Sequence, residues 1–275
     1  MPILRRFASG DIAWHFDPEL VPDGISLAFS ERTGGRSAPP YDSLNMSDQV
    51  GDDPEAVAEN RRLLMSALGL DPATQSRLHW CIQTHGTHVA HIDEPLGDPV
   101  LPDADALITA TPGIPLLICV ADCVPIIVVA RGPRRALAVI HSGWKGTLAR
   151  IAGAAVAALQ ETYQVDPADL SAYIGPYIGP ASFEISPDVA ARYASEFPDV
   201  AQTPAEGETV RLDLGAALTR TLLDAGLSRE SIAILGEDTA AAGAPWYSYR
   251  ASGGVTGRQA ALACLLPPDG ERVHA

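Results

Sequence analysis

Residues 115–144, PLLICVADCVPIIVVARGPRRALAVIHSGW, contain two long apolar runs separated by a turn. The first run, 115–130, is rich in Val and Ile and shows no apolar–polar alternation, so it predicts one long strand buried on both faces. RGPRR at 131–135 has the Gly and Pro of a turn, and the run 136–144 predicts a returning strand. This stretch therefore indicates an antiparallel strand pair in the interior of the protein.

Strand and helix patterns alternate on both sides of this pair. Asp53 before Pro54 is a good N-cap for a helix, and acids fill the first turn. The predicted helices are 52–70, 147–164, 186–197 and 213–227. The predicted strands are 24–32, two within 77–93, 104–110, one starting at 171, one at 231–235 and two within 245–266. No linker or repeat divides the chain, so a single α/β domain over residues 1–275 is expected.

The composition favours a cytoplasmic protein with a large core. The chain has 275 residues, 47% of them hydrophobic, and no apolar run approaches the roughly 20 residues that span a bilayer. Residues 1–16 lack the apolar segment of a secretory signal. A formal charge of −15 and a pI of about 4.7 argue against nucleic-acid binding, which depends on clustered Lys and Arg. A small anionic substrate held by a few local donors remains compatible.

The predicted strand pair brings a cysteine close to a histidine. If the runs pair around residues 131–135, opposed residues have numbers summing to about 264–266, and Cys123 lies opposite residues 141–143. Cys123 and His141 share a face only if the loop length or a bulge corrects the strand parity. A thiol beside an imidazole is a nucleophile pair, half of a zinc or copper site, or a buried cysteine near a strand-end histidine. Spacing leaves these three interpretations open.

Three more histidines occur in QTHGTHVAHI, residues 83–92. His85 precedes Gly86, where the backbone can bend, whereas His88 and His91 are interpreted as surface residues. The four cysteines form no CxxC pair, which argues against a disulfide framework. Asp122, next to Cys123, is either an acceptor for a ligand histidine or an acid at a strand edge.

Several glycine-rich segments contain Lys or Arg side chains. In SGWKGT, residues 142–147, a strand, loop and helix start would let backbone amides and Lys145 hold an anion. The segment lacks the full phosphate-loop signature, and a structural turn is the alternative. The loop 30–45 carries Arg32 and Asn45, and 247–258 carries two further arginines that are either ligand contacts or solvated charges.

A set of longer motifs in the same order resembles one known family. The resemblance covers about residues 24–266, and the sequence is similar to the multicopper-oxidase-like laccase-domain family, whose members are also called polyphenol oxidases and purine nucleoside phosphorylases. The motifs are SLNMSDQVGDDPEAVAENRRLL, QTHGTHV, ADALIT, ADCVPIIV, IHSGWKGT, IGPYIGP and YSYRASGGVTGR.

The resemblance implies a single domain with a four-layer α/β/β/α sandwich of mixed sheets. It also implies one divalent metal, generally zinc, held by His85, Cys123 and His141, with copper as the alternative ion. The implied activity is phosphorolysis of adenosine, inosine, guanosine and methylthioadenosine, with deamination of adenosine at the same site. The sequence departs from the usual family pattern at Gln49, within 178–185 and 236–243, and at 251–252, which bears on substrate preference more than on the metal ligands.

Candidate substrate contacts follow from this activity. Arg32, Lys145 and the amides of Gly146 and Thr147 are candidates for contacts to phosphate or base, and Asn45 for a hydrogen bond to base or ribose. Purine nucleosides and phosphate are then the expected partners, without nucleic acid or membrane, and no pattern defines an oligomeric state. Three classes remain: a zinc purine-nucleoside enzyme, a copper phenol oxidase, and a Cys–His hydrolase or non-enzymatic binding protein.

Overall fold

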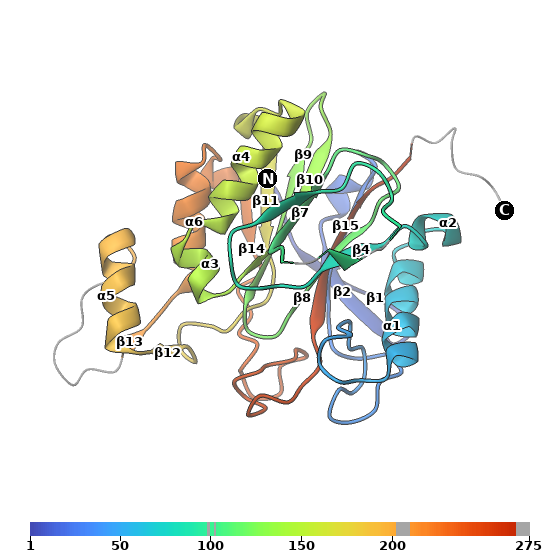
Figure 1. Ribbon diagram of the computed structural model, residues 1–275, viewed down its shortest axis with the longest axis horizontal. Helices are drawn as coiled ribbons and strands as arrows, with labels where there is room; N and C mark the ends of the chain where they lie inside the picture. The colour runs from blue at the N-terminus through green and yellow to red at the C-terminus, as the bar shows by residue number, and fades with distance from the viewer. Residues whose placement is uncertain (98–99, 102, 202–209, 268–275) are drawn as a thin grey trace.

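Two mixed β-sheets form the centre of the protein, and helices cover both outer faces (Figure 1). The computed structural model describes residues 1–97, 100–101, 103–201 and 210–267. The expected α/β fold with an α/β/β/α sandwich of mixed sheets is confirmed, because helices of separate parts of the chain pack on the two outer sheet faces. None of the described helices is long and apolar enough to cross a membrane.

The first sheet has seven strands and mixes antiparallel with parallel pairs. Its order is β1 (Arg5–Ser9), β2 (Ile12–Phe16), β3 (Ile25–Ser30), β15 (Gln259–Leu265), β8 (Leu116–Val120), β4 (His79–Cys81) and β6 (Val100–Leu101). The second sheet has six strands. Its order is β14 (Ile232–Ile234), β11 (Leu170–Ile174), β9 (Val124–Ala130), β10 (Ala136–Ser142), β7 (Ala106–Thr109) and β5 (Val89–His91). A separate ribbon pairs β12 (Glu184–Ile185) with β13 (Val210–Arg211).

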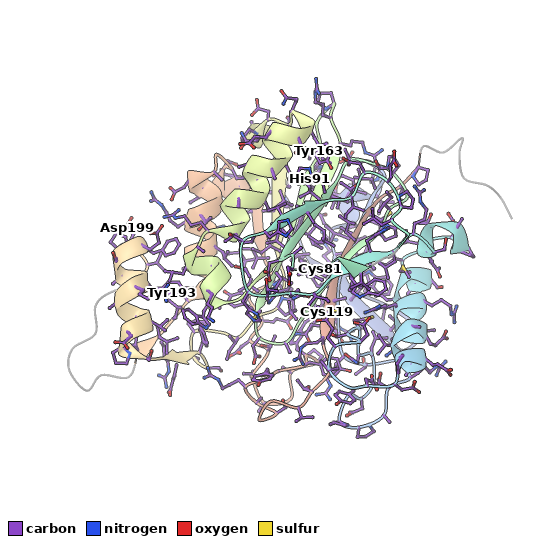
Figure 2. The ribbon with its side chains drawn as sticks, in the orientation of Figure 1. Cys81, His91, Cys119, Tyr163, Tyr193 and Asp199 are labelled. Carbon is purple, nitrogen blue, oxygen red and sulfur yellow. The ribbon has the colours of Figure 1, made fainter. Side chains whose placement is uncertain are left out.

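The helices divide between the two outer faces (Figure 1). They are α1 (Pro54–Ala67), α2 (Pro72–Gln75), α3 (Trp144–Leu148), α4 (Ile151–Tyr163), α5 (Pro187–Glu196) and α6 (Leu214–Asp224). Helix α1 packs on the first sheet, and α4 and α6 pack on the second. Tyr193 of α5 donates a 2.6 Å hydrogen bond to the carbonyl of Trp144, which ties α5 to α3 (Figure 2).

The apolar run 115–130 is two strands rather than the single long strand predicted. Strand β8 belongs to the first sheet and β9 to the second, and the chain crosses between them at residues 121–123. Asp122 has a φ of 85°, a left-handed conformation that no regular strand contains. Both strands lie in apolar surroundings, so the hydrophobic pattern continues across the break and conceals it. The crossing places Cys123 between the two sheets.

Two other sequence predictions need correction. The predicted helix 147–164 is divided, because Arg150 has a φ of 60° between α3 and α4. The predicted aromatic strand at 245–250 forms turns instead. Its backbone bonds to a side chain rather than to a neighbouring strand, since the Tyr247 amide donates to the Gln259 side chain at 2.8 Å. The remaining predicted helices are confirmed, and the Asp53 carboxylate accepts from the Glu55 amide at 3.0 Å as an N-cap.

Candidate metal centre

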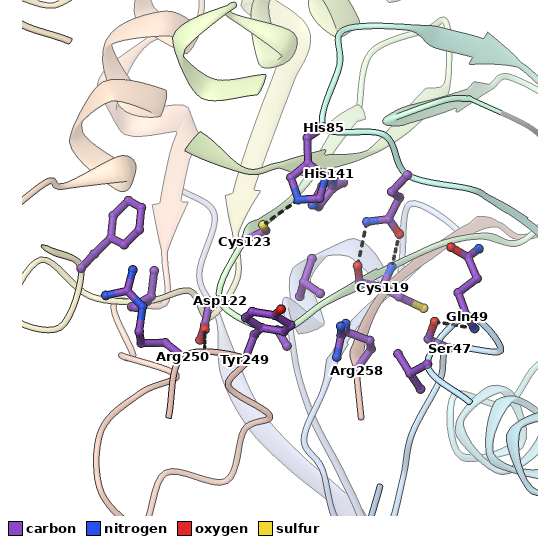
Figure 3. Close-up of a pocket in the computed structure, with 16 residues that line it drawn as sticks. Ser47, Gln49, His85, Cys119, Asp122, Cys123, His141, Tyr249, Arg250 and Arg258 are labelled. Carbon is purple, nitrogen blue, oxygen red and sulfur yellow. Dashed lines mark hydrogen bonds between the residues drawn. The ribbon is translucent and has the colours of Figure 1, made fainter. Parts of the chain in front are cut away.

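Two imidazoles and a thiol from separate segments meet in one place. The candidate ligand atoms of His85, Cys123 and His141 all lie within 4.8 Å of one another. The Cys123 sulfur is 3.7 Å from Nε2 of His85, and the two imidazole rings meet edge-on with centroids 4.7 Å apart. Figure 3 shows both rings beside the Cys123 sulfur.

The strand register explains how Cys123 and His141 meet. Strands β9 and β10 pair antiparallel, with His141 opposite Pro125 and Ser142 opposite Val124. Continuing this register places Cys123 opposite Gly143, just beyond the last paired residues. Because Cys123 belongs to the crossing and not to the ladder, its side chain is free of the parity that a regular strand would impose.

Gly143 is required for the close approach of the three side chains. A Cβ atom at this position would lie 2.6 Å from Cδ2 of His85 and 3.1 Å from the sulfur of Cys123. The first of these distances is shorter than nonbonded carbons tolerate. The glycine after the strand end therefore leaves the space in which His85 approaches Cys123.

Asp105, the residue before β7, holds two of the three candidate ligands. Its fully buried carboxylate accepts from the backbone amides of His85 at 2.9 Å and Gly86 at 2.6 Å. Thr84 adds its amide at 3.3 Å and its hydroxyl at 3.0 Å. Nδ1 of His141 lies 2.8 Å from the same carboxylate. Because a carboxylate only accepts, Nδ1 of His141 carries a proton, so the neutral form of this imidazole offers a lone pair on Nε2 to a metal.

Sequence reasoning missed Asp105, although the signal was present. In ADALIT an acid stands between two alanines at the start of an apolar run, and a buried carboxylate requires several donors. Asp122, the acid considered for this role, accepts from the Thr239 hydroxyl at 2.7 Å and the Arg250 amide at 2.6 Å instead. It therefore anchors two loops and does not orient a histidine.

The metal-free site favours a thiolate beside an imidazolium. Burial raises the pKa of the Cys123 thiol, but the charges and hydrogen bonds of His141 and His85 outweigh burial and lower it to about 6. Burial lowers the pKa of His141, whereas Cys123 and Asp105 raise it to about 9. Burial raises the pKa of Cys119 to about 12. Cys123 is thus a thiol prepared to lose its proton at neutral pH.

The donor set suits a divalent or soft transition metal. Two imidazole nitrogens and one thiolate bind zinc in tetrahedral sites, and the same donors bind copper. Three protein ligands leave a fourth position for a small molecule, which is the arrangement of catalytic zinc sites. The hydrogen bond from His141 to Asp105 is the outer-shell contact that metal-bound histidines commonly have.

The three side chains line a cavity of about 540 Å³. This volume lies in the range of small-molecule sites. Phe183 and Tyr249 contribute aromatic rings. Arg250 and Arg258 contribute guanidinium groups, and both are labelled with Tyr249 in Figure 3. The other lining residues are Ser47, Gln49, Val50, Gln83, Cys119, Val120, Ala121, Asp122 and Ile178.

Arg32 and Asn45 do not line this cavity. The Arg32 guanidinium stacks 4.7 Å from the centre of the Tyr247 ring and donates to the Asp42 carbonyl at 2.9 Å. Asn45 is fully buried, and its Oδ1 accepts from the Arg258 amide at 2.9 Å. Asn45 therefore supports a cavity residue and does not face the cavity itself.

The expected anion site at the start of α3 also lies outside the cavity lining. Lys145 is exposed on this five-residue helix. The Thr147 hydroxyl is buried and hydrogen-bonded to Ser142 at 2.8 Å, and a Cβ at Gly146 would lie 3.3 Å from the Gly86 carbonyl oxygen. These residues pack the helix against the His85 loop, as the structural-turn interpretation predicts.

His88 and His91 are exposed, in agreement with their interpretation as surface residues. Ser47, Phe183 and Tyr249 also line the cavity, although the sequence did not single them out as candidates. Each comes from a loop, and a single aromatic or hydroxyl side chain in a loop carries no periodic signal. Their common location becomes visible only in the folded chain.

Comparison with known proteins is consistent with this geometry. A family model described as multi-copper polyphenol oxidoreductase laccase matches residues 26–266. A purine nucleoside phosphorylase of Deinococcus radiodurans is 36% identical over 91% of this chain and 93% of its own length. One of Streptomyces coelicolor is 40% identical over 64% of this chain and 71% of its own.

Solved structures show the same fold. YlmD from Geobacillus stearothermophilus superimposes with a TM-score of 0.86 at 30% identity, covering 97% of this chain and all of that one. The YfiH protein of Bacillus licheniformis reaches 0.84 at 27% identity, covering 95% of this chain and 98% of its own. With the family model covering most of the sequence, the chain belongs to the multi-copper polyphenol oxidoreductase laccase family, several of whose relatives are named purine nucleoside phosphorylases.

Proposed function

We propose that this protein is a zinc-dependent purine nucleoside phosphorylase that also deaminates adenosine. The observation that carries the proposal is the meeting of His85, Cys123 and His141 in a cavity that also contains aromatic rings and guanidinium groups. The relatives named purine nucleoside phosphorylase support the reaction class. Adenosine, inosine, guanosine and methylthioadenosine are the proposed substrates.

His85, Cys123 and His141 would hold the zinc ion, and Asp105 would keep the His141 proton on Nδ1. When bound, zinc supplies a Lewis acid and lowers the pKa of water in its open position from 15.7 to about 7. Deamination then needs water to add to the purine carbon that bears the amine, after which ammonia leaves. The protein's contribution is to hold the three metal-donor atoms in place and to orient the purine so that its amine-bearing carbon faces the metal site.

Phosphorolysis makes different demands on the cavity. A phosphate oxygen attacks the anomeric carbon, the glycosidic carbon–nitrogen bond breaks, and the base leaves with the bonding pair and takes up a proton. Phe183 and Tyr249 offer ring faces for the purine. Arg250 and Arg258 offer positive charge where phosphate and the departing base carry negative charge. Arg32, Lys145 and Thr147 would act only indirectly, since they lie outside the cavity lining.

The test is product analysis with zinc-loaded protein and adenosine, with and without phosphate. Ribose 1-phosphate and adenine, formed only with phosphate, are expected from phosphorolysis, and inosine is expected from deamination. Cys123→Ser should abolish both reactions by removing one metal donor. If no product forms at any zinc loading, the proposal fails.

The low pKa of Cys123 favours one second candidate, a Cys–His hydrolase. The Cys123 thiol has a pKa of about 6 and His141 one of about 9, so the pair is a thiolate beside an imidazolium at neutral pH. Cys–His hydrolases use such an activated pair. A hydrolase would keep its activity under chelation and lose it on alkylation of Cys123. The zinc enzyme would instead lose activity under chelation and recover it when zinc is restored.

The family description favours testing copper as the alternative ion. The same two imidazoles and one thiolate bind copper well. Metal analysis of protein produced without added copper distinguishes the ions. Phenol oxidation that requires copper, together with absent nucleoside cleavage, would make the protein a phenol oxidase.

A further inference from the structure

Within the described part of the chain, Arg258 carries a positive charge into the cavity without an acidic partner. It is half-buried in the segment before β15 and lines the cavity. One guanidinium nitrogen, Nη1, donates to the carbonyls of Thr256 at 2.8 Å and Gly257 at 3.0 Å. Among the residues that the structure describes, no carboxylate lies within ion-pair distance of Arg258. Its Nε and Nη2 atoms have no hydrogen-bond partner there either.

The backbone of Arg258 is fixed from behind by buried groups. Its amide donates to Oδ1 of the fully buried Asn45 at 2.9 Å, and its carbonyl accepts from the Met46 amide at 3.0 Å. A Cβ at Gly257 would lie 2.6 Å from the Tyr247 ring, so the chain before Arg258 is closely packed. Arg258 is therefore held in place, unlike an arginine on a free surface loop.

The surroundings of Arg258 favour an incoming anion. Burial lowers the pKa of this guanidinium, because the charge loses water without gaining a counter-ion. The one carboxylate in the cavity lining, Asp122, is already engaged by Thr239 and by the Arg250 amide. Arg250 also lines the cavity, 5.5 Å from the Phe183 ring centre, and has no ion pair with any described residue. In a chain of net charge −15, this cavity wall is locally cationic.

We infer that Arg258 forms the subsite for a tetrahedral oxyanion, inorganic phosphate, in the same cavity as the candidate metal ligands. A guanidinium with two uncommitted nitrogens can bind two oxygens of one phosphate at once. This assignment rests on the proposed phosphorolysis for its biological meaning. It replaces Lys145 and the α3 amides, which lie outside the cavity, with a residue that faces into it.

The experiment titrates inorganic phosphate into zinc-loaded protein by calorimetry. Arg258→Gln should weaken phosphate binding at least tenfold, and Arg258→Lys should weaken it less, because a point charge remains but the planar fork is lost. Arg62→Gln is the matched control, since Arg62 is exposed on α1, where it pairs with Glu59, and does not line the cavity. Unchanged phosphate binding in either folded, zinc-loaded Arg258 variant, or equal weakening in the control, would overturn the inference.

A second arm separates this site from the metal. Cys123→Ser lacks a metal donor, and phosphate should still bind to it within a few-fold of the wild-type affinity. Complete loss in this variant would assign phosphate to the metal and refute the role of Arg258. In an active enzyme, Arg258→Gln should raise the KM for phosphate while the Kd for adenosine stays within a few-fold. If the wild type makes no ribose 1-phosphate, the proposed function fails, whereas the direct titration still decides the anion site.

Discussion

At the scale of single residues, one carboxylate organises the candidate metal centre. Asp105 accepts from His141 and from the amides around His85, so one buried charge orients ligands from two separate segments. The hydrogen bonds to this carboxylate outweigh burial, which would raise its pKa, and lower the pKa to about 2. Asp105 is therefore ionised at neutral pH, where a metal would bind to the candidate ligands.

Asp105→Asn should weaken zinc binding by 10–100-fold, the range observed when outer-shell partners of metal ligands are lost. An asparagine amide would place donors against the donors of Gly86 and His141. The measurement is competition with a chromogenic chelator at neutral pH. Asp103→Asn, an exposed neighbour, is the matched control and should bind zinc as the wild type does. Equal zinc affinity in both variants would refute the positioning role.

Gly143→Ala should fold but bind zinc at least tenfold more weakly. The added methyl would meet His85 at 2.6 Å and force the imidazole away from Cys123. Gly97→Ala adds the same methyl where no atom lies within 4 Å, so its zinc affinity should not change. Circular dichroism checks folding, and chelator competition measures zinc. If Gly143→Ala bound zinc with wild-type affinity, the close approach of His85 to Cys123 at this glycine would not be needed for metal binding.

Cys123 should be the thiol that alkylates first in metal-free protein. Its pKa of about 6 means that it is thiolate at pH 7, whereas the Cys119 pKa of about 12 keeps that thiol protonated. The rate of carboxamidomethylation, followed by peptide mass spectrometry, should have a midpoint near pH 6 and not near the ordinary 8.5. Stoichiometric zinc should protect Cys123. Faster labelling at Cys119 would contradict the assignment.

At the scale of elements, the split between β8 and β9 builds the site. Were 115–130 one strand, Cys123 would lie inside a ladder with its direction dictated by strand parity. The left-handed Asp122 instead takes the chain from one sheet to the other and leaves Cys123 at the junction. Asp122 is held there by Thr239 and the Arg250 amide, so the break depends on loops distant in sequence.

Helix α1 offers a test of local stability that is independent of the site. Asp53→Ala removes the acceptor for the Glu55 amide and should lower the free energy of unfolding by about 1 kcal/mol. Asp53→Asn keeps an acceptor, so it should lower the free energy of unfolding by only a few tenths of a kcal/mol. Urea denaturation measures both. Zinc affinity should be unchanged, and a loss of zinc binding would show that α1 and the metal centre are coupled.

At the scale of the whole molecule, the candidate ligands connect both sheets. His85 lies in the loop between β4 of the first sheet and β5 of the second, Cys123 lies at the crossing, and His141 lies in β10. A metal would have a much higher affinity for the folded protein, in which the three ligands meet, than for the unfolded chain. Metal binding should therefore stabilise the entire fold and not one loop.

Zinc should raise the melting temperature of the metal-free protein, because a ligand at 100 times its Kd adds about 2.7 kcal/mol to native stability. Removing the metal with a chelator should reverse the shift. Cys123→Ser should show little or no shift, since it lacks the thiolate donor. Differential scanning calorimetry gives the comparison. An equal shift in wild type and Cys123→Ser would place the stabilising metal elsewhere.

Sequence patterns alone were enough to predict the fold class, most helices and a set of candidate metal ligands. Helix periodicity and the Asp53 N-cap are local signals, and donor chemistry belongs to the side chain whatever the fold. Family motifs, read as a resemblance, connected His85, Cys123 and His141 before any coordinates did. These features share one property, which is that each is encoded within a few neighbouring residues.

The position of the break in the apolar run, the acid that orients His141 and the arginines that face the cavity became known from the folded chain. The sequence pointed to Asp122 as the acceptor for a ligand histidine, but Asp105 is the acid that accepts from His141 and from the amides of the His85 loop. Lys145 was the candidate anion contact in the sequence, but it is exposed outside the cavity lining, whereas Arg258 lines the cavity. The physical reason is that burial, orientation and charge pairing come from contacts between segments far apart in the chain, and such contacts leave no periodic trace in the sequence.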